Sequence, residues 1–189
     1  MPALISSKVE KKKFKILLNE MGFNKNNDII LKIVAGICVG VIFFSFGDFL
    51  IIFFRNIVIE RILGTEFVEE GQEGMINTIP LQPNLIQIII LLIFQIIIIG
   101  PCEEAFFRVF IIKKTRGKLK LGYSIVLSSI IFAFYHVPLF LVPLSTFITF
   151  FGYYFVLGLL LALVFISFDN SIIPISVAHS CFNILVLLI

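Results

Sequence analysis

Five polar side chains, Glu103, Glu104, His136, His179 and Asn183, lie inside otherwise apolar segments of this chain. Carboxylates are costly in hydrocarbon, and those kept there are usually paired and functional. The two histidines are the only ones in the sequence. Since Glu and His are common general acids and bases, the pattern indicates chemistry carried out within a membrane.

The spacing of these residues sorts them into pairs. Glu104 and Arg108 are four residues apart, which places acid and base on one helical face in the favourable order. Glu103 projects about 100° away from Glu104 and is therefore free for another partner. His179 and Asn183 have the same spacing. Side by side, they could orient a water molecule, bind a metal or donate hydrogen bonds to an oxyanion.

A third pair and a potential ligand set follow from the same residues. Phe132 precedes His136 by four positions and is expected to pack beneath the imidazole and limit its rotamers. Glu103, His136 and His179 together form a ligand set typical of hydrolytic zinc sites. However, there is no HExxH helix, and the two histidines lie on different segments. We expect no obligatory metal, with zinc as the ion that this set would hold.

These residues must be positioned by membrane helices. The chain has 189 residues, 59% of them hydrophobic, and a mean hydropathy of +1.10. Apolar runs of about 20 residues are typical of transmembrane helices. We predict one all-α, polytopic bundle of about five transmembrane helices over residues 29–189, a multi-pass protein of the cell membrane. The predicted spans are 29–54, 84–112, 121–137, 145–168 and 172 to the C-terminus.

Two segments fall outside these spans. Residues 1–28 are rich in lysine and lack the apolar core of a signal peptide, so we expect a cytosolic or interfacial lead-in. Residues 55–83 carry five glutamates and are predicted to be a solvated acidic loop, with an interfacial helix over 57–63 as the alternative. Within the spans, Gly36 and Gly40 would let another helix approach closely. Gly100-Pro101 predicts a kink just before the glutamates.

Charge patterning orients the bundle. Seven lysines lie between positions 8 and 32, and five cations lie between 113 and 120. Cytoplasmic loops of membrane proteins carry such an excess, so the N-terminus and the basic turn are predicted to be cytoplasmic. Because these cations flank apolar segments, we assign them to topology and anionic lipid headgroups rather than to nucleic acid.

Counting helix rise tests whether the polar groups can meet. Glu103 comes out about 15 Å above the cytoplasmic edge, His179 about 12 Å and His136 about 24 Å. The first two depths agree, and the third agrees if its helix tilts or begins below the membrane plane. One shared intramembrane cluster is therefore predicted.

The ordered motifs EExxxR, FxxxH and HxxxN resemble those of the CAAX prenyl protease type II family, also called the CPBP or Abi family of intramembrane proteases. The matching residues are Glu103, Glu104 and Arg108, then Phe132 and His136, then His179 and Asn183. The resemblance covers residues 84–189, the family's catalytic core. Better-known members carry more membrane helices than the five predicted here, which leaves the substrate entry route open.

The resemblance implies an endopeptidase that hydrolyses a peptide bond of a membrane-associated, CAAX-type substrate. Glu103 would activate water, and His136 would be its partner at the scissile carbonyl. His179 and Asn183 would complete the site and stabilise the oxyanion. Glu104, Arg108 and Phe132 would support these groups.

Two other classes of protein remain open at this point. A proton- or cation-coupled carrier would also use buried carboxylates, although carriers often have paired broken helices and only Gly100-Pro101 qualifies. A non-catalytic, bacteriocin-immunity-type membrane protein is the third class. The Lys-, Ile- and Asn-rich, Trp-free composition looks prokaryotic, which favours a membrane-associated peptide or protein as substrate over a prenylated one. The expected partners are this substrate and membrane lipids.

Overall fold

The computed structural model describes residues 28–76 and 83–188, together with Ile16, Asn19 and Gly22. Within these residues the regular structure is entirely helical, which confirms the all-α prediction. In chain order it contains α3 (Ile29–Ile52), η1 (Phe53–Ile59), α4 (Glu60–Leu63), α5 (Thr65–Glu73), α6 (Leu85–Phe94), η2 (Gln95–Ile99), α7 (Gly100–Glu104), η3 (Ala105–Ile112), α8 (Lys113–Thr115), α9 (Leu121–His136), α10 (Leu144–Ser167) and α11 (Ile172–Leu188), where η marks a π-helical segment. The predicted lead-in lies almost wholly outside the described residues.

Consecutive segments join into long helices. Ile29–Leu63, Leu85–Thr115 and Leu144–Ser167 are each long and apolar enough to cross a membrane. The other two predicted spans are the apolar helices α9, with 16 residues, and α11, with 17. All five apolar segments are therefore helical, and three of them have the full length expected of a span.

The predicted acidic loop at 55–83 is wrong over its described part. The first helix continues past residue 54 to Leu63, and α5 follows after Gly64, whose φ of 91° breaks the helix. The alternative of a helix over 57–63 is closer, but this stretch prolongs the first helix. At 1.5 Å per residue that helix is about 52 Å long, well beyond the hydrocarbon thickness. Its charged end can therefore lie in water while remaining helical.

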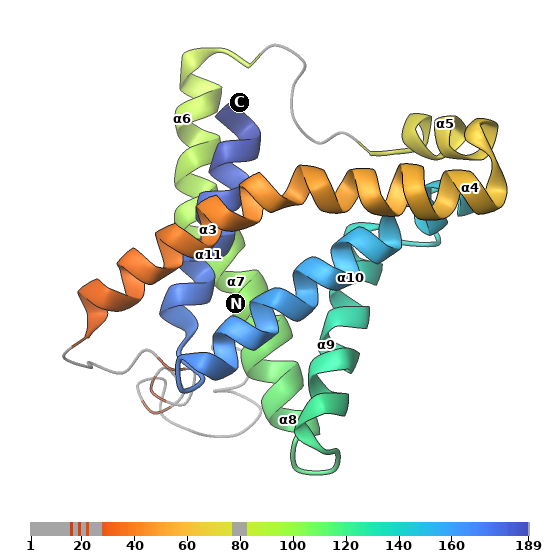
Figure 1. Ribbon diagram of the computed structural model, residues 1–189. Helices are drawn as coiled ribbons and strands as arrows, with labels where there is room; N and C mark the ends of the chain where they lie inside the picture. Colours follow the sequence, from red (N-terminus) through yellow and green to blue (C-terminus); the bar gives the residue numbers. More distant parts are fainter. Residues whose placement is uncertain (1–15, 17–18, 20–21, 23–27, 77–82, 189) are drawn as a thin grey trace.

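The helices differ in tilt. In Figure 1, α3 runs from side to side and α10 runs diagonally, whereas α9, α11 and the Leu85–Thr115 helix stand more upright. The predicted close approach at Gly36 and Gly40 is confirmed, because both face α11. A Cβ added at Gly36 would lie 2.7 Å from the carbonyl oxygen of Pro174, and one at Gly40 would lie 2.6 Å from the Cβ of Cys181. Small residues thus let α3 pack directly on α11.

The glutamate-bearing helix is irregular at the predicted position. A capping box between Asn84 and Gln87 starts it, and the π-helical segments η2 and η3 then flank the single α-helical turn α7. The helix changes direction between α6 and α7 (Figure 1), next to Gly100-Pro101. Because π-helical segments cause kinks and are frequent at functional sites, functional residues are expected on or beside α7.

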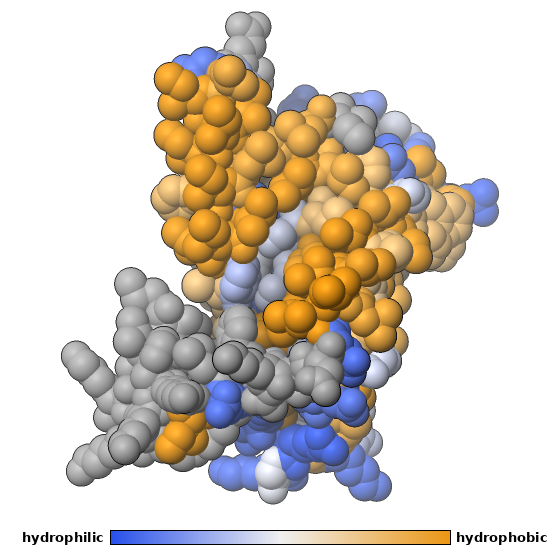
Figure 2. Space-filling view, turned by 90° about the vertical axis from the view of Figure 1, so that its left-hand side faces the viewer, coloured by the Kyte–Doolittle hydropathy of each residue, from blue (hydrophilic) through white to orange (hydrophobic). Residues whose placement is uncertain are grey.

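The surface agrees with a membrane location. Figure 2 shows a mostly hydrophobic exterior over the upper body and hydrophilic residues at the lower end, where Figure 1 places α8 and the basic turn. Large apolar side chains are exposed along α3 and α6, for example Ile30 and Ile86. Such an exterior needs lipid as its solvent. The protein is an integral membrane protein.

Candidate active site

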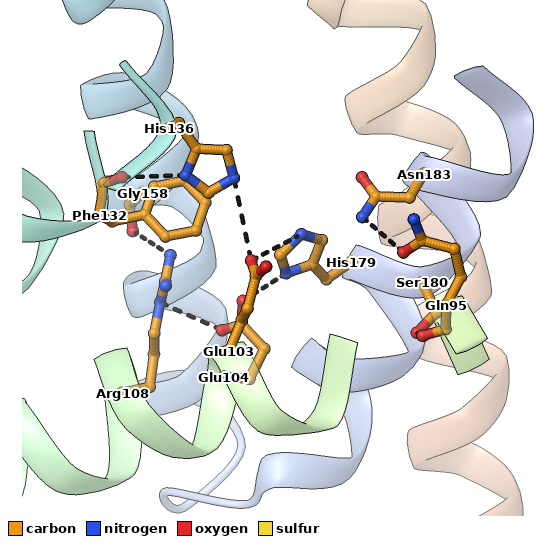
Figure 3. A network of polar contacts seen from close by, with 10 residues as sticks. All are labelled: Gln95, Glu103, Glu104, Arg108, Phe132, His136, Gly158, His179, Ser180 and Asn183. Atoms are coloured by element: carbon orange, nitrogen blue, oxygen red, sulfur yellow. Dashed lines mark hydrogen bonds and ion pairs between the residues drawn. The ribbon is translucent and has the colours of Figure 1, made fainter. Parts of the chain in front are cut away.

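Three side chains from three helices meet at one point, as predicted. Glu103 Oε2 lies 3.8 Å from Nε2 of His136 and 3.7 Å from Nε2 of His179. Figure 3 shows the carboxylate of Glu103 between the two imidazoles. The side chains are 15%, 21% and 5% exposed, respectively, so the cluster is screened from bulk solvent. Because His136 lies beside Glu103, the count of helix rise overestimated the difference in depth between these two residues.

His179 is held by charge. Its Nδ1 lies 2.6 Å from Oε1 of Glu104, and an ionised carboxylate only accepts hydrogen bonds. Nδ1 therefore carries the proton, and Nε2 is turned toward Glu103. The other oxygen of Glu104 pairs with Nε of Arg108 at 3.1 Å, and both side chains are fully buried. The predicted Glu104–Arg108 pair is confirmed, and it extends to His179.

His136 is held by its own helix and by aromatic rings. Its Nδ1 lies 2.9 Å from the carbonyl oxygen of Phe132, to which it donates because a carbonyl can only accept. The ring centroid lies 4.1 Å from that of Phe132 and 4.8 Å from that of Tyr154. The expected packing of Phe132 against the imidazole is confirmed. Nε2 is again left pointing at Glu103.

Arg108 connects the two sides of the cluster. Besides its pair with Glu104, it donates from Nη2 to the carbonyl oxygen of Gly158 on α10, at 3.1 Å. Its guanidinium carbon lies 4.4 Å from the ring centroid of Phe132, within the range of a cation–π contact. The buried cation Arg108 therefore contacts a group that holds each histidine, namely Glu104 for His179 and Phe132 for His136.

Asn183 lines the same cavity but has a different immediate partner. Its Nδ2 donates to Oε1 of Gln95 at 3.0 Å, and within the described part of the chain it forms no hydrogen bond with Glu103 or either histidine. Figure 3 shows this amide pair beside His179. The predicted shared face of His179 and Asn183 is confirmed, since both line one cavity.

The cavity around the cluster has a volume of about 420 Å³. Its carboxylate, imidazole and amide groups are those described above, and aromatic side chains, two of them with hydroxyl groups, contribute much of the remaining wall, namely Phe43, Phe132, Tyr153, Tyr154 and Phe182. Glu103 Oε2 is buried and has no hydrogen-bond partner in the described part of the chain. A polar atom in that position calls for a small ligand or water.

One carboxylate and two imidazoles are residue types that commonly bind a metal ion. One ligand atom each from Glu103, His136 and His179 lies within 4.8 Å of the others. Each imidazole has its Nδ1 held by an oxygen acceptor, the usual second shell of a zinc-binding histidine. The separations of 3.7 and 3.8 Å are, however, wider than the roughly 3.3 Å between ligands of a tetrahedral zinc ion with 2.0–2.1 Å bonds.

Gln95 and Tyr154 line the cavity but were not predicted as site residues. Gln95 had a visible signal, because it is a lone amide within the apolar run at 88–99. Tyr154 had none, since it lies in an aromatic-rich stretch of α10 whose facing surface only the tertiary structure defines.

Fold and site together define an integral membrane protein with a buried carboxylate–imidazole cluster suited to acid–base chemistry. Residues 85–185 match the family model described as "Type II CAAX prenyl endopeptidase Rce1-like". This match covers more than half of the chain, and the chain belongs to that family. The resemblance found from the three motifs is confirmed, and the protein is a CAAX-type intramembrane endopeptidase at the family level. Neither a curated protein nor a solved structure matches it.

Proposed function

We propose that this protein hydrolyses a peptide bond of a membrane-associated protein or peptide with water activated by Glu103. The observation that carries this proposal is the position of Glu103 Oε2, unpartnered and within 3.7–3.8 Å of two Nε2 atoms. One water molecule in hydrogen-bonding contact with all three atoms fits these separations. A general base must reach the proton that it removes, and a water molecule held between these three atoms would lie within that reach of Glu103.

The reaction proceeds in two steps. Glu103 takes a proton from water while the water oxygen bonds to the scissile carbonyl carbon, with His136 beside the same water. The carbonyl oxygen becomes an oxyanion. When the carbon–nitrogen bond breaks, the proton on Glu103 passes to the leaving amine nitrogen. The products are a new carboxyl group and a new amine, and no serine or cysteine nucleophile takes part.

The net charge of the buried cluster supports His179 as a hydrogen-bond donor to the oxyanion. The buried cluster contains two carboxylates, Glu103 and Glu104, and one guanidinium, Arg108. One additional proton makes this set neutral, and uncompensated charge in a low-dielectric interior is costly. When that proton is on His179, Glu104 holds Nδ1–H while Nε2–H is available to donate to the oxyanion. Asn183 would supply a second donor.

Topology, location and substrate are part of the same proposal. We place the N-terminus and the basic turn 113–120 on the cytoplasmic side of the cell membrane, with five crossings. The apolar, aromatic cavity wall favours apolar substrate residues around the scissile bond. A prenylated CAAX end and an unprenylated membrane peptide both satisfy this chemistry, so the assay below includes both.

We propose that no metal is obligatory. If zinc binds, Glu103, His136 and His179 would hold it, and the ion would supply Lewis-acid polarisation and an acidified water. In its absence the same three residues hold the water by hydrogen bonds, which the observed separations accommodate.

The test is Glu103→Gln in protein reconstituted into liposomes, assayed with farnesylated and unprenylated peptides. General-base loss is expected to lower turnover by about 10²–10⁴-fold with an unchanged melting temperature. Asp48→Asn is the matched control, because Asp48 is an exposed carboxylate on α3 outside the cavity, and it should stay within about twofold of wild type.

Retained cleavage in Glu103→Gln would contradict the mechanism. Proton flux into the liposomes that depends on Glu103, without proteolysis, would instead indicate a carrier. For substrate identity, the membrane proteome of cells expressing Glu103→Ala should accumulate an uncleaved precursor.

A further inference from the structure

Gln95 is the one polar residue of η2, whose other four residues are isoleucines. It follows Phe94 and precedes four isoleucines, it is half-buried, and it lines the same cavity as Glu103 and Asn183. An amide facing hydrocarbon would be costly. The side chain is therefore kept on the cavity side of its helix by a specific interaction.

That interaction joins two carboxamides. Gln95 Oε1 accepts a hydrogen bond from Nδ2 of Asn183 at 3.0 Å. Among the described residues this is the only hydrogen bond of the Asn183 side chain. One Nδ2 hydrogen is thus taken by Gln95, which leaves the second Nδ2 hydrogen available to a group in the cavity.

The main chain of Gln95 is anchored to the same helix. Its carbonyl oxygen accepts from Oγ of Ser180 at 2.9 Å and from the backbone N–H of Gly100, which closes the π-helical turn. Gly100 favours this approach, because an added Cβ would clash with Oγ of Ser180 in its observed position. Gln95 is therefore fixed to α11 through both backbone and side chain.

We infer that Gln95 is a positioning residue that sets the orientation of the Asn183 carboxamide for the reaction. The final torsion of an asparagine side chain is broad and poorly defined by itself. A rotated amide would present Oδ1, an acceptor, to the developing oxyanion and would repel it. By accepting one N–H, Gln95 keeps the nitrogen directed to the cavity before the reaction begins, which is the condition for oxyanion stabilisation.

This inference rests on the proposed function, because it gives Asn183 an oxyanion role. The simpler alternative is that the amide pair only joins η2 and α11. Interhelical hydrogen bonds in membrane proteins contribute little stability on average. A purely structural pair would change melting temperature and leave turnover unaffected at temperatures where the protein is folded.

The experiment is a double-mutant cycle with Gln95→Met and Asn183→Ala, measuring kcat, KM and melting temperature. Gln95→Met should lower kcat by about tenfold, less than the 10²–10³-fold typical of deleting an oxyanion donor, with KM within about twofold. In the Asn183→Ala background, Gln95→Met should have no further effect on kcat, because it acts through Asn183.

Two further variants separate the roles. Gln95→Asn keeps a neutral carboxamide acceptor on a shorter side chain and should give a kcat between those of Gln95→Met and wild type. Ser180→Ala removes only the backbone anchor and should lower the melting temperature while leaving kcat within about twofold. Equal losses from Gln95→Met in both backgrounds, or an unchanged kcat, would overturn the inference.

The outcomes also distinguish this inference from the proposed function. Wild-type kcat in Asn183→Ala overturns the role of Asn183 and of Gln95, while loss of cleavage in Glu103→Gln still supports the mechanism. Retained cleavage in Glu103→Gln removes the mechanism itself, whatever the effect of Gln95.

Discussion

The two histidines present the same nitrogen to Glu103, yet the surroundings that hold them differ in kind. His179 is fixed by a buried ionic chain through Glu104 to Arg108. His136 is fixed by a carbonyl of its own helix and by the rings of Phe132 and Tyr154. His179 is thus held by ionic contacts and His136 by packing. Mutations on the His179 side should lower both stability and activity, whereas mutations on the His136 side should lower mainly activity.

The largest expected effect is on turnover when either histidine is removed. His136→Leu and His179→Leu should each lower kcat by about 10²–10⁴-fold, the range for loss of an acid–base group. Only His179→Leu should also destabilise the fold, by about 1–3 kcal/mol, because it leaves a buried oxygen of Glu104 without its partner. Turnover and thermal denaturation in one detergent would measure both effects. Equal destabilisation by the two variants would show that the comparison is wrong.

The ionic side can be broken at Arg108. Arg108→Met leaves Glu104 as an uncompensated buried charge and should destabilise the protein by about 3–5 kcal/mol. Adding Glu104→Gln removes that charge and should restore much of the melting temperature. Cleavage by the double variant should nevertheless be low, because His179 then lacks its charged partner Glu104. If the double variant is as unstable as Arg108→Met alone, the buried pair is not the source of the loss.

The aromatic side should give smaller effects. Tyr154→Leu removes one of the rings packed against His136 and loses about 0.5–1.5 kcal/mol of ring–ring interaction. If this loss appears in the transition state, turnover falls by at most about tenfold. Tyr154→Phe keeps the ring and serves as the matched control, with turnover expected within about twofold of wild type. A large loss in Tyr154→Phe would assign the hydroxyl, and not the ring, the important role.

The smallest expected effect is that of a chelator, because the proposal needs no metal. Treatment with 1,10-phenanthroline should change peptidase activity by less than about twofold, since hydrogen bonds from the three residues hold the water. Activity that is lost on chelation and regained with zinc, but not with magnesium, would convert the cluster into a metal centre. Zinc binding by calorimetry, compared between wild type and His179→Leu, would check this independently of activity.

Interactions within one helix were predictable from sequence because helix geometry fixes them. The pairing of Glu104 with Arg108 and the packing of Phe132 on His136 both follow from a spacing of four residues. The helical course of residues 55–63 was missed, because charged residues after an apolar run were interpreted as a loop. The lead-in 1–28 and the membrane domain 29–189 stay predictions.

By itself, the sequence determined the class of the fold, the family and the residues able to do acid–base chemistry, because hydropathy and local spacing carry that information. Only the tertiary structure decided that Glu104 pairs with His179 and that Gln95 pairs with Asn183. These contacts join residues 75 and 88 positions apart. They depend on helix tilt, on close approach at glycines and on the way a π-helical turn rotates the side chains that follow it. None of these is encoded in the periodicity of a single helix.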